Sequence, residues 1–254
     1  MNGLFEGKVA LVTGSGAGLG RASAIAFARD GASVVVADIN AETGPKTVQV
    51  INNAGGKAIF VETDVTKANE VEAMVNKAVE TYGRLDCAHN NVGIEPLAAS
   101  IIECTEEQWD HVIATDLKSV WLCLKYEITY MVDHGGGAIV NTSSIAGLVG
   151  PEDVCEYIAS KHGVNGLTKA VAMGYAKRGI RVNAVCPAGM RGTEMYQRVS
   201  ARDPEFVPKM LEGIPMKRDA EPEEVAEAVI WLCSDKASYV TGCCMAVDGG
   251  FTAQ

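Results

Sequence analysis

A tyrosine and a lysine four residues apart are the side chains best suited to catalysis in this sequence. Tyr157 and Lys161 occupy a segment of helical character and should share one helix face. An ammonium this close favours the phenolate, so we expect the pKa of Tyr157 to fall from about 10 toward that of a working base. Ser144, thirteen residues before the tyrosine, could hydrogen-bond a reacting oxygen. An isolated pair of this kind is commonly a surface pair, so its meaning depends on the rest of the chain.

A glycine-rich loop, TGSGAGLG at residues 13–20, lies between the first apolar run and the first helical pattern. The common GxGxxG spacing fails because Leu19 occupies its third position, whereas Gly14, Gly18 and Gly20 fit GxxxGxG. Glycines allow close backbone approach, and a helix N-terminus offers free N–H groups to a diphosphate. No Lys-Ser or Lys-Thr follows the loop, which excludes an ATP-hydrolysing P-loop.

Asp38 ends the second apolar run, about 20 residues after the glycines. A carboxylate there could accept hydrogen bonds from both hydroxyls of an adenosine ribose, and it would repel a 2′-phosphate. The neighbouring residues Ser15, Ala17, Ile39 and Asn40 supply no compensating cation. NAD is therefore favoured over NADP; the alternative is that Asp38 is only a turn residue at the end of a strand.

Composition excludes several classes of protein. The 254 residues carry a formal charge of −10, and the pI is near 4.9, so no basic stripe is available for nucleic acid. No apolar run approaches the roughly 20 residues of a membrane span, and the N-terminus lacks a signal-peptide pattern. The eight cysteines form no CxxC pair, which favours unpaired, reduced and buried thiols in an intracellular, cytoplasmic protein. No ligand spacing predicts a metal site.

Apolar runs alternate with helical patterns along the whole chain. The runs span residues 8–12, 33–37, 58–61, 85–89, 138–142, 180–185 and 241–247. The helical patterns span 19–29, 41–53, 67–82, 105–131, 157–177 and 221–234, and a capping box is expected at Thr105-Gln108. This predicts an α/β fold with a Rossmann-type, doubly wound, seven-stranded parallel sheet, helices on both faces and a single domain over 1–254. Residues 188–220 lack a regular pattern and are predicted to form a substrate lid.

Taken together, these motifs resemble those of the short-chain dehydrogenase/reductase family over residues 6–251. Further matches are Asp64-Val65, NNVG at 90–93, NAVCP at 183–187 and DGG at 248–250. The resemblance implies that Tyr157 is the general acid or base, that Lys161 holds the nicotinamide ribose, and that Ser144 binds the substrate oxygen. It implies a cofactor site made of Gly14, Ser15, Gly18, Leu19, Gly20, Asp38, Ile39, Asp64, Val65, Asn91, Gly93, Tyr157, Lys161, Pro187, Met190 and Thr193.

Three positions depart from the family pattern. Asp116 replaces the usual asparagine, and we hypothesise that its carboxylate stabilises the Lys161 ammonium; a tolerated side chain without a role is the alternative. Ala188 is inserted between Pro187 and Gly189, which loosens the assignment of Met190 and Thr193. His89 stands in place of a strand aliphatic and is interpreted as a core histidine.

The residues around Ser144 and Tyr157 predict an apolar substrate pocket. Its expected walls are Ile145, Ala146, Val149, Pro151, Val154 and Cys155, with Ile94, Met190, Met195 and Tyr196. A neutral alicyclic or aromatic secondary alcohol or ketone fits these walls. Glu95 and Glu152 disfavour an anionic substrate, whereas Arg191 and Arg198 could reverse that. A lyase or isomerase, and a non-catalytic NAD-binding protein, remain open alternatives. The resemblance also implies a homotetramer or homodimer.

Overall fold

The computed structural model describes residues 3–95 and 97–254; Met1, Asn2 and Pro96 of the expected domain lie outside the described residues. Seven parallel strands form one sheet in the order β3-β2-β1-β4-β5-β6-β7. The strands are β1 (Val9–Thr13), β2 (Ser33–Asp38), β3 (Lys57–Glu62), β4 (Cys87–Asn90), β5 (Gly137–Thr142), β6 (Ile180–Pro187) and β7 (Cys244–Val247). The predicted doubly wound architecture and single domain are confirmed.

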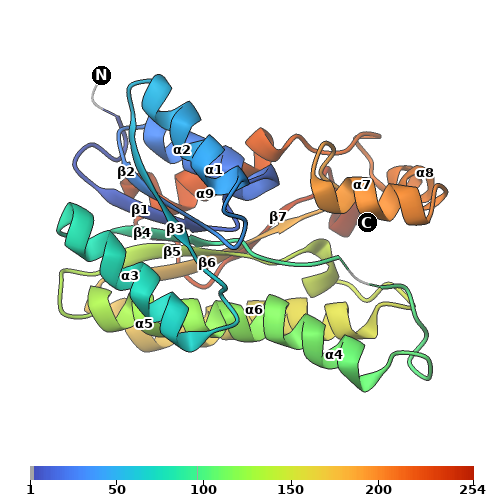
Figure 1. Cartoon of the computed structure of the whole chain (residues 1–254). Helices are drawn as coiled ribbons and strands as arrows, with labels where there is room; N and C mark the ends of the chain where they lie inside the picture. Colours follow the sequence, from blue (N-terminus) through green and yellow to red (C-terminus); the bar gives the residue numbers. More distant parts are fainter. Residues whose placement is uncertain (1–2, 96) are drawn as a thin grey trace.

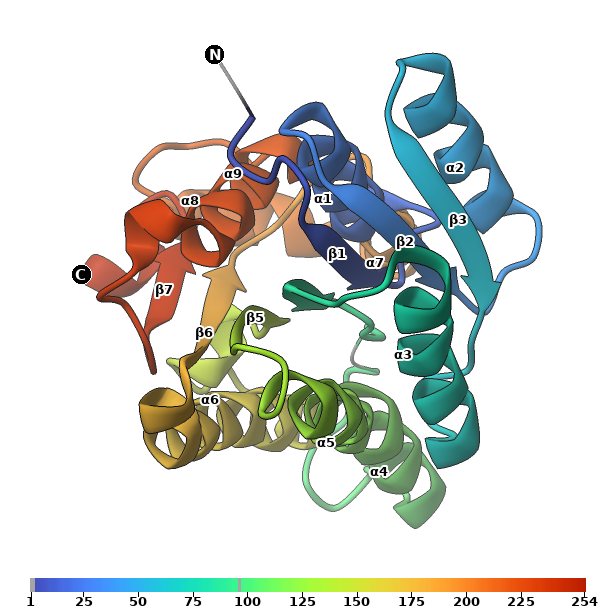
Figure 2. The ribbon, with the colours of Figure 1, turned by 90° about the vertical axis from the view of Figure 1, so that its left-hand side faces the viewer.

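Helices cover both faces of the sheet (Figure 1). One face carries α1 (Gly18–Arg29), α2 (Thr43–Asn53) and α9 (Pro222–Cys233), and α1 packs against α9. The other face carries α3 (Ala68–Tyr82), α4 (Glu106–Val112), α5 (Ser119–Met131) and α6 (Cys155–Tyr175). Figure 2, seen from the side, shows the twisted sheet between these two layers.

Burial on both faces explains why the central strands are almost wholly apolar. In β1, Ala10 and Val12 pack into the core beneath α1 and α9, whereas Leu11 packs into the opposite core beneath α3 and α5. In β2 the same alternation divides Val34 and Val36 from Val35. Each buried valine or leucine side chain stabilises the fold by about 1.5–3 kcal/mol of transfer free energy. The sheet is thereby fixed in register against both helix layers.

The strand order reverses between β1 and β4, which begin connections to opposite sides of the sheet. A crevice opens at the carboxyl ends of the strands at such a reversal, and ligands bind there in open α/β sheets. The loops after β1, β2, β4, β5 and β6 all meet at this edge, so residues far apart in the sequence are brought together.

The structure differs from the sequence prediction in two regions. The helix expected over 105–131 is divided by a π-helical turn, Ile113–Lys118, between α4 and α5. Thr105 caps α4 by accepting from the Gln108 N–H at 3.2 Å, but the Gln108 side chain bonds Leu97 and Glu156, so only half of the capping box forms. Residues 188–220, predicted to form a lid without regular structure, contain α7 (Glu194–Arg202) and α8 (Phe206–Gly213).

Across the described ranges 3–95 and 97–254, no helix has both the length and the apolar character needed to cross a membrane.

Candidate active site

A cavity of about 820 Å³ lies along the carboxyl edge of the sheet. Its walls come from the loops after β1, β2, β3, β4, β5 and β6 and from α7 and α8. Fourteen of the sixteen residues expected to form the cofactor site line it together with Ser144: Gly14, Gly18, Leu19, Asp38, Ile39, Asp64, Val65, Asn91, Gly93, Tyr157, Lys161, Pro187, Met190 and Thr193. Ser15 and Gly20, the remaining two residues, lie behind the cavity wall.

Three side chains of the expected acid–base set meet at the middle of the cavity. The first two turns of α6 present Tyr157 and Lys161 on one face, with the lysine Nζ 5.3 Å from the centre of the tyrosine ring. Ser144 follows β5, and its hydroxyl accepts a hydrogen bond from the Ala146 N–H at 3.1 Å. The same hydroxyl hydrogen-bonds Tyr157, which lowers the pKa of the phenol. The geometry therefore joins a phenol, an ammonium and a hydroxyl around one point.

The expected depression of the Tyr157 pKa is not found in the protein alone. Burial raises the pKa of the phenol above its usual value, and the nearby negative charge of Asp116 raises it further. Lys161 and Ser144 act in the opposite direction but do not overcome burial. The sequence argument counted the lysine and left out both the desolvation of the ring and the second charge.

Asp116 lies directly behind the lysine, on the π-helical turn. Its Oδ2 is 3.1 Å from the Lys161 Nζ, and the two side chains are 0% and 3% exposed. Burial disfavours the charge on Lys161, yet Asp116 and Tyr157 together raise the pKa of the lysine above its ordinary value. Burial also raises the pKa of Asp116, and the ammonium opposes that shift. The pair thus holds the lysine in its charged form.

Gly93 provides the space in which this ion pair sits. A methyl group at position 93 would lie 3.2 Å from the Lys161 Nζ and 3.5 Å from the Asp116 Oδ2. The next residue, Ile94, donates its backbone N–H to the Asp116 Oδ1 at 2.9 Å. The NNVG loop therefore positions the carboxylate as well as lining the cavity, a role that its sequence did not indicate.

The dinucleotide end of the cavity is built mainly from backbone groups. The Gly16 N–H donates to the Asp38 Oδ2 at 2.7 Å, and the Asn40 N–H donates to the Oδ1 at 2.9 Å. Gly18 has a φ of +51°, which a residue with a side chain rarely adopts. A Cβ on Gly20 would lie 2.1 Å from the Gly14 carbonyl oxygen, so α1 can approach the loop only with glycine there.

Ser15 stabilises this loop from behind the cavity wall. Its hydroxyl donates to the carbonyls of Val12 and Ala37, at 2.8 Å and 3.2 Å, and so ties β1 to β2. Asn91, which follows β4, also stabilises the loop: its Nδ2 donates to the Thr13 carbonyl at 3.2 Å. Both residues shape the site by fixing the loop between β1 and α1.

The free N–H groups at the start of α1, the carboxylate of Asp38 and the close approach enforced by Gly20 fit a dinucleotide. Without a basic residue beside it, Asp38 offers acceptors to ribose hydroxyls. Thr193, at the far end, caps α7 by accepting from the Tyr196 N–H at 3.2 Å and donates its hydroxyl to the Met190 carbonyl at 3.1 Å. Its hydroxyl is thus engaged within the protein, although the residue lines the cavity.

The substrate end differs from the expected pocket at two positions. Ile94, Ile145, Ala146, Pro151, Val154, Met190, Met195 and Tyr196 line the cavity as predicted. Val149 and Cys155 do not, because Cys155 begins α6 with its sulfur toward Glu156. Sequence reasoning missed several lining residues, Ala98, His111, Ala114, Thr115, Val199, Val207 and Met210. They come from segments whose place beside Tyr157 depends on tertiary packing.

His89 is a core histidine, as interpreted from the sequence. It is fully buried in β4, and its Nε2 lies 2.9 Å from the Thr142 Oγ1. Burial lowers the pKa of this imidazole to about 3, so it is neutral at physiological pH. It does not line the cavity formed by the described residues.

This fold and this site define an oxidoreductase built on a dinucleotide-binding sheet. A family model described as enoyl-(acyl carrier protein) reductase matches residues 14–252. A cyclohexanol dehydrogenase of Acinetobacter sp. (strain SE19) is 42% identical over 254 residues, covering 100% of this chain and 98% of the relative. A cis-4-hydroxycyclohexanecarboxylate dehydrogenase of Sinomonas cyclohexanicum is 42% identical and covers 100% of both chains. The crystal structure of levodione reductase superimposes with a TM-score of 0.94 at 35% identity, covering 98% of this chain and 99% of that one.

The chain therefore belongs to the short-chain dehydrogenase/reductase family. Members of this family use a nicotinamide dinucleotide, and the residues at the dinucleotide end of the cavity suit such a cofactor.

Proposed function

We propose that this protein is an NAD-dependent dehydrogenase that interconverts an alicyclic secondary alcohol and its ketone. The observation that carries the proposal is the arrangement of Ser144, Tyr157 and Lys161 at the centre of one long cavity, with Asp38 at its dinucleotide end. The named relatives act on ring alcohols, which supports the same class of substrate here.

The nicotinamide, when bound, supplies the hydride acceptor for alcohol oxidation. Tyr157 takes the proton of the substrate hydroxyl in that direction and returns it in ketone reduction. Ser144 hydrogen-bonds the same oxygen and orients the carbinol carbon. Lys161 would hold a ribose hydroxyl, and Asp116 keeps the lysine positively charged. The charge of Lys161 favours the tyrosinate, whereas the charge of Asp116 opposes it.

NAD rather than NADP is proposed because of the charge near Asp38. Both carboxylate oxygens already accept a backbone N–H, so the side chain is held in place at the end of β2. A 2′-phosphate would meet this negative charge, and Ile39 and Asn40 beside it are uncharged. A rigid carboxylate without a cation selects a free ribose hydroxyl over a phosphate ester.

A neutral substrate is proposed because Arg191 and Arg198 are paired with acids, and Arg202, which also lines the cavity, interacts electrostatically with Glu95. Arg198 forms two bonds to Glu95, at 2.6 Å and 2.9 Å, and Arg191 is paired with Glu221. Around Ser144 and Tyr157 the wall is mainly aliphatic, with Pro151 and several methionines. The outer part also carries the acids Glu152, Glu194 and Asp203 and the base Arg202. A six-membered ring bearing one hydroxyl suits the aliphatic part of the wall.

The proposal is tested by incubating the purified enzyme with cyclohexanol and either NAD or NADP. We expect NADH and cyclohexanone to appear in equal amounts, with little NADPH. Binding of NAD without any reduced cofactor, over a panel of ring, aromatic and linear alcohols and ketones, would contradict a dehydrogenase. Conversion of a substrate without net NADH would instead support the lyase or isomerase alternative.

We also propose that the enzyme assembles into a homotetramer or homodimer. Large apolar side chains are exposed on α5, on α6 and before β7, among them Trp121 at 46%, Met173 at 82% and Tyr239 at 102%. Such residues on two long helices and beside the last strand are typical of subunit interfaces. Light scattering at micromolar concentration tests the assembly. The cytoplasmic location stays a prediction.

A further inference from the structure

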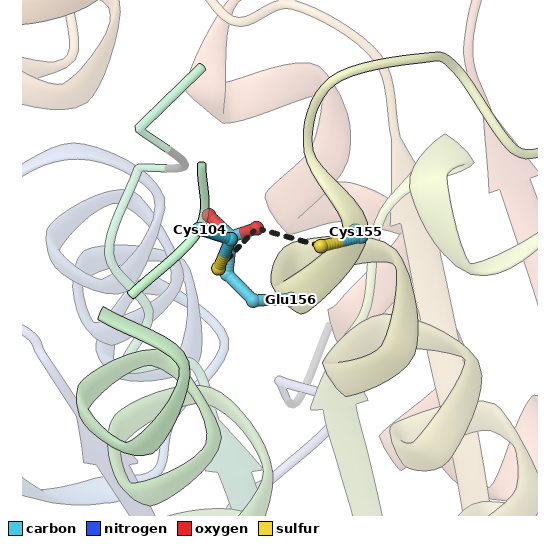
Figure 3. A group of neighbouring side chains, drawn as sticks. All are labelled: Cys104, Cys155 and Glu156. Carbon is cyan, nitrogen blue, oxygen red and sulfur yellow. Dashed lines mark hydrogen bonds between the residues drawn. The ribbon is translucent and has the colours of Figure 1, made fainter. Parts of the chain in front are cut away.

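Two cysteines and a buried glutamate meet outside the active-site cavity. The thiol–carboxylate cluster consists of Cys104, Cys155 and Glu156 (Figure 3). Cys104 comes just before α4, and the other two residues form the first turn of α6. None of the three lines the active-site cavity. The cluster spans two elements far apart in the sequence, which is why cysteine spacing alone did not indicate it.

The distances within the cluster approach those of a metal site. The Glu156 Oε2 lies 3.9 Å from the Cys104 Sγ and 3.7 Å from the Cys155 Sγ, and all three atoms are within 4.8 Å of one another. Around a tetrahedral zinc, with Zn–S near 2.3 Å and Zn–O near 2.1 Å, the ligand atoms stand about 3.5–3.8 Å apart. Small side-chain rotations would therefore bring the three atoms into coordination.

A second observation concerns how Glu156 is held. Its side chain is fully buried, and its Oε1 accepts a hydrogen bond from the Gln108 Nε2 at 2.8 Å. Gln108 also donates to the Leu97 carbonyl at 2.9 Å, so its amide is fixed in orientation. The Oε2 is thereby turned toward the two sulfur atoms, as Figure 3 shows. Hydrogen bonds that orient a carboxylate in this way are typical of the outer shell of metal sites.

From this geometry we propose that Cys104, Cys155 and Glu156 bind one zinc ion, with water as the fourth ligand. Two thiolates select a borderline ion such as Zn²⁺ over Mg²⁺ or Ca²⁺. Both cysteines are partly exposed, so the ion and the water can enter from solvent. The site would join the segment before α4 to the start of α6, next to Tyr157, and stabilise that junction without taking part in hydride transfer.

Zinc binds the thiolate form of cysteine, so its binding at this cluster releases protons. The affinity for zinc is therefore expected to rise with pH.

The experiment uses the full-length enzyme, reduced and then treated with a chelator, and titrates it with zinc chloride by calorimetry. We expect one equivalent of Zn²⁺ to bind and to raise Tm, and Co²⁺ to give a thiolate-to-metal charge-transfer band. Cys104→Ser and Cys155→Ser should each weaken binding by more than about tenfold and abolish the band. Gln108→Ala should weaken binding by about tenfold through loss of the orienting bond.

Cys243→Ser is the matched control, because Cys243 is also a partly exposed free cysteine but lies beside β7. Its affinity for zinc should equal that of the unmodified enzyme. Equal binding by the unmodified enzyme and both cluster variants, or no uptake of zinc by the reduced enzyme, would overturn the proposal. So would a Cys104–Cys155 disulfide that forms equally fast with and without zinc. None of these outcomes depends on the proposed alcohol substrate.

Discussion

The two ends of the active-site cavity are constructed in different ways. At the dinucleotide end, backbone N–H groups hold Asp38 at 2.7 Å and 2.9 Å, and the loop rests on buried strands β1 and β2. At the substrate end, α7 is joined to the loop after β4 by Arg198 and Glu95, and the Arg198 side chain is 53% exposed. The first end is fixed by backbone N–H groups on a loop that rests on buried strands, and the second by exposed side-chain contacts.

This difference shows how one scaffold can keep its cofactor and change its substrate. A substitution at the dinucleotide end disturbs backbone geometry that the core enforces, so most changes there are costly. At the substrate end, the cavity is lined by side chains of a two-helix segment whose attachment is at the surface. Surface ion pairs contribute little, so that segment can vary in sequence and position. Tyr157 and Lys161 stand between the two ends.

Replacing Tyr157, which lies where the two ends meet, should have the largest effect on the reaction rate. We expect Tyr157→Phe to lower the rate of alcohol oxidation by about 10²- to 10⁴-fold, because the acid–base group is lost. Binding of NADH, followed by its fluorescence, should be unchanged. Tyr130→Phe, on α5 outside the cavity, is the control and should retain full activity. A Tyr157→Phe enzyme with more than a tenth of the normal rate would show that another group moves the proton.

Replacing Asp38, at the dinucleotide end of the cavity, should have the next largest effect. Asp38→Ala should weaken the use of NAD by about 10- to 100-fold, since hydrogen bonds to a charged acceptor contribute about 1.5–3 kcal/mol. Asp38→Asn is the matched variant, because it keeps an acceptor for the Gly16 N–H while removing the charge. We expect both variants to gain activity with NADP. The ratio of kcat/KM with NAD to kcat/KM with NADP measures this preference. An unchanged ratio in both variants would show that Asp38 does not determine the choice of cofactor.

Replacing Asp116, which lies behind Lys161, should have a smaller effect, mainly on the pH dependence of the rate. The charge of Asp116 raises the pKa of Tyr157, so Asp116→Asn should lower that pKa. Oxidation needs the deprotonated phenol, and the rising limb of its pH–rate profile should therefore move to lower pH. The rate at neutral pH should change by less than about tenfold, because the amide oxygen can still accept from Ile94.

Glu127→Gln is the control for this shift, since Glu127 is another fully buried acid but bonds Asn90, at 3.0 Å, rather than Lys161. Burial raises the pKa of Glu127 to about 7, so its titration affects stability: the folded state loses stability as the pH rises from about 4.5 through 7. The pH–rate profile of the Glu127→Gln enzyme should lie at the same pH as that of the unmodified enzyme. Equal profiles for Asp116→Asn and the unmodified enzyme would leave the Asp116 carboxylate without a role in proton transfer.

The sequence was most informative where local spacing determines geometry. The glycine pattern before α1, the acid at the end of β2 and the Tyr157–Lys161 spacing each place groups within one turn or one loop. Alternating apolar runs were enough to predict the doubly wound sheet, because both faces of its central strands are buried.

Features that depend on contacts between distant segments were not predicted. The raised pKa of Tyr157 comes first from burial of the ring by tertiary packing, and then from the charge of Asp116. Asp116 is placed by a π-helical turn that has no signature in the sequence. Gln108 was expected to complete a capping box, but Glu156, 48 residues away, competes for its amide. In the predicted lid, α7 was missed because it has few apolar residues and is positioned by its ion pair with Glu95.

The smallest effect concerns that ion pair. Arg198→Gln removes both bonds to Glu95 and should raise KM for the alcohol about 1.5- to 5-fold, since an exposed pair contributes about 0.2–1 kcal/mol. The KM for NAD should stay constant, because Asp38 and the glycine loop are untouched. Arg84→Gln is the matched control: Arg84 makes the same two-bond contact to Asp86, at 2.8 Å and 2.6 Å, and is 55% exposed, but lies before β4.

High salt should reproduce the rise in KM in the unmodified enzyme but add little to the rise in the Arg198→Gln enzyme. An equal rise in KM for both substrates would mean that α7 also positions the cofactor, and the two ends would then be less independent than their construction suggests.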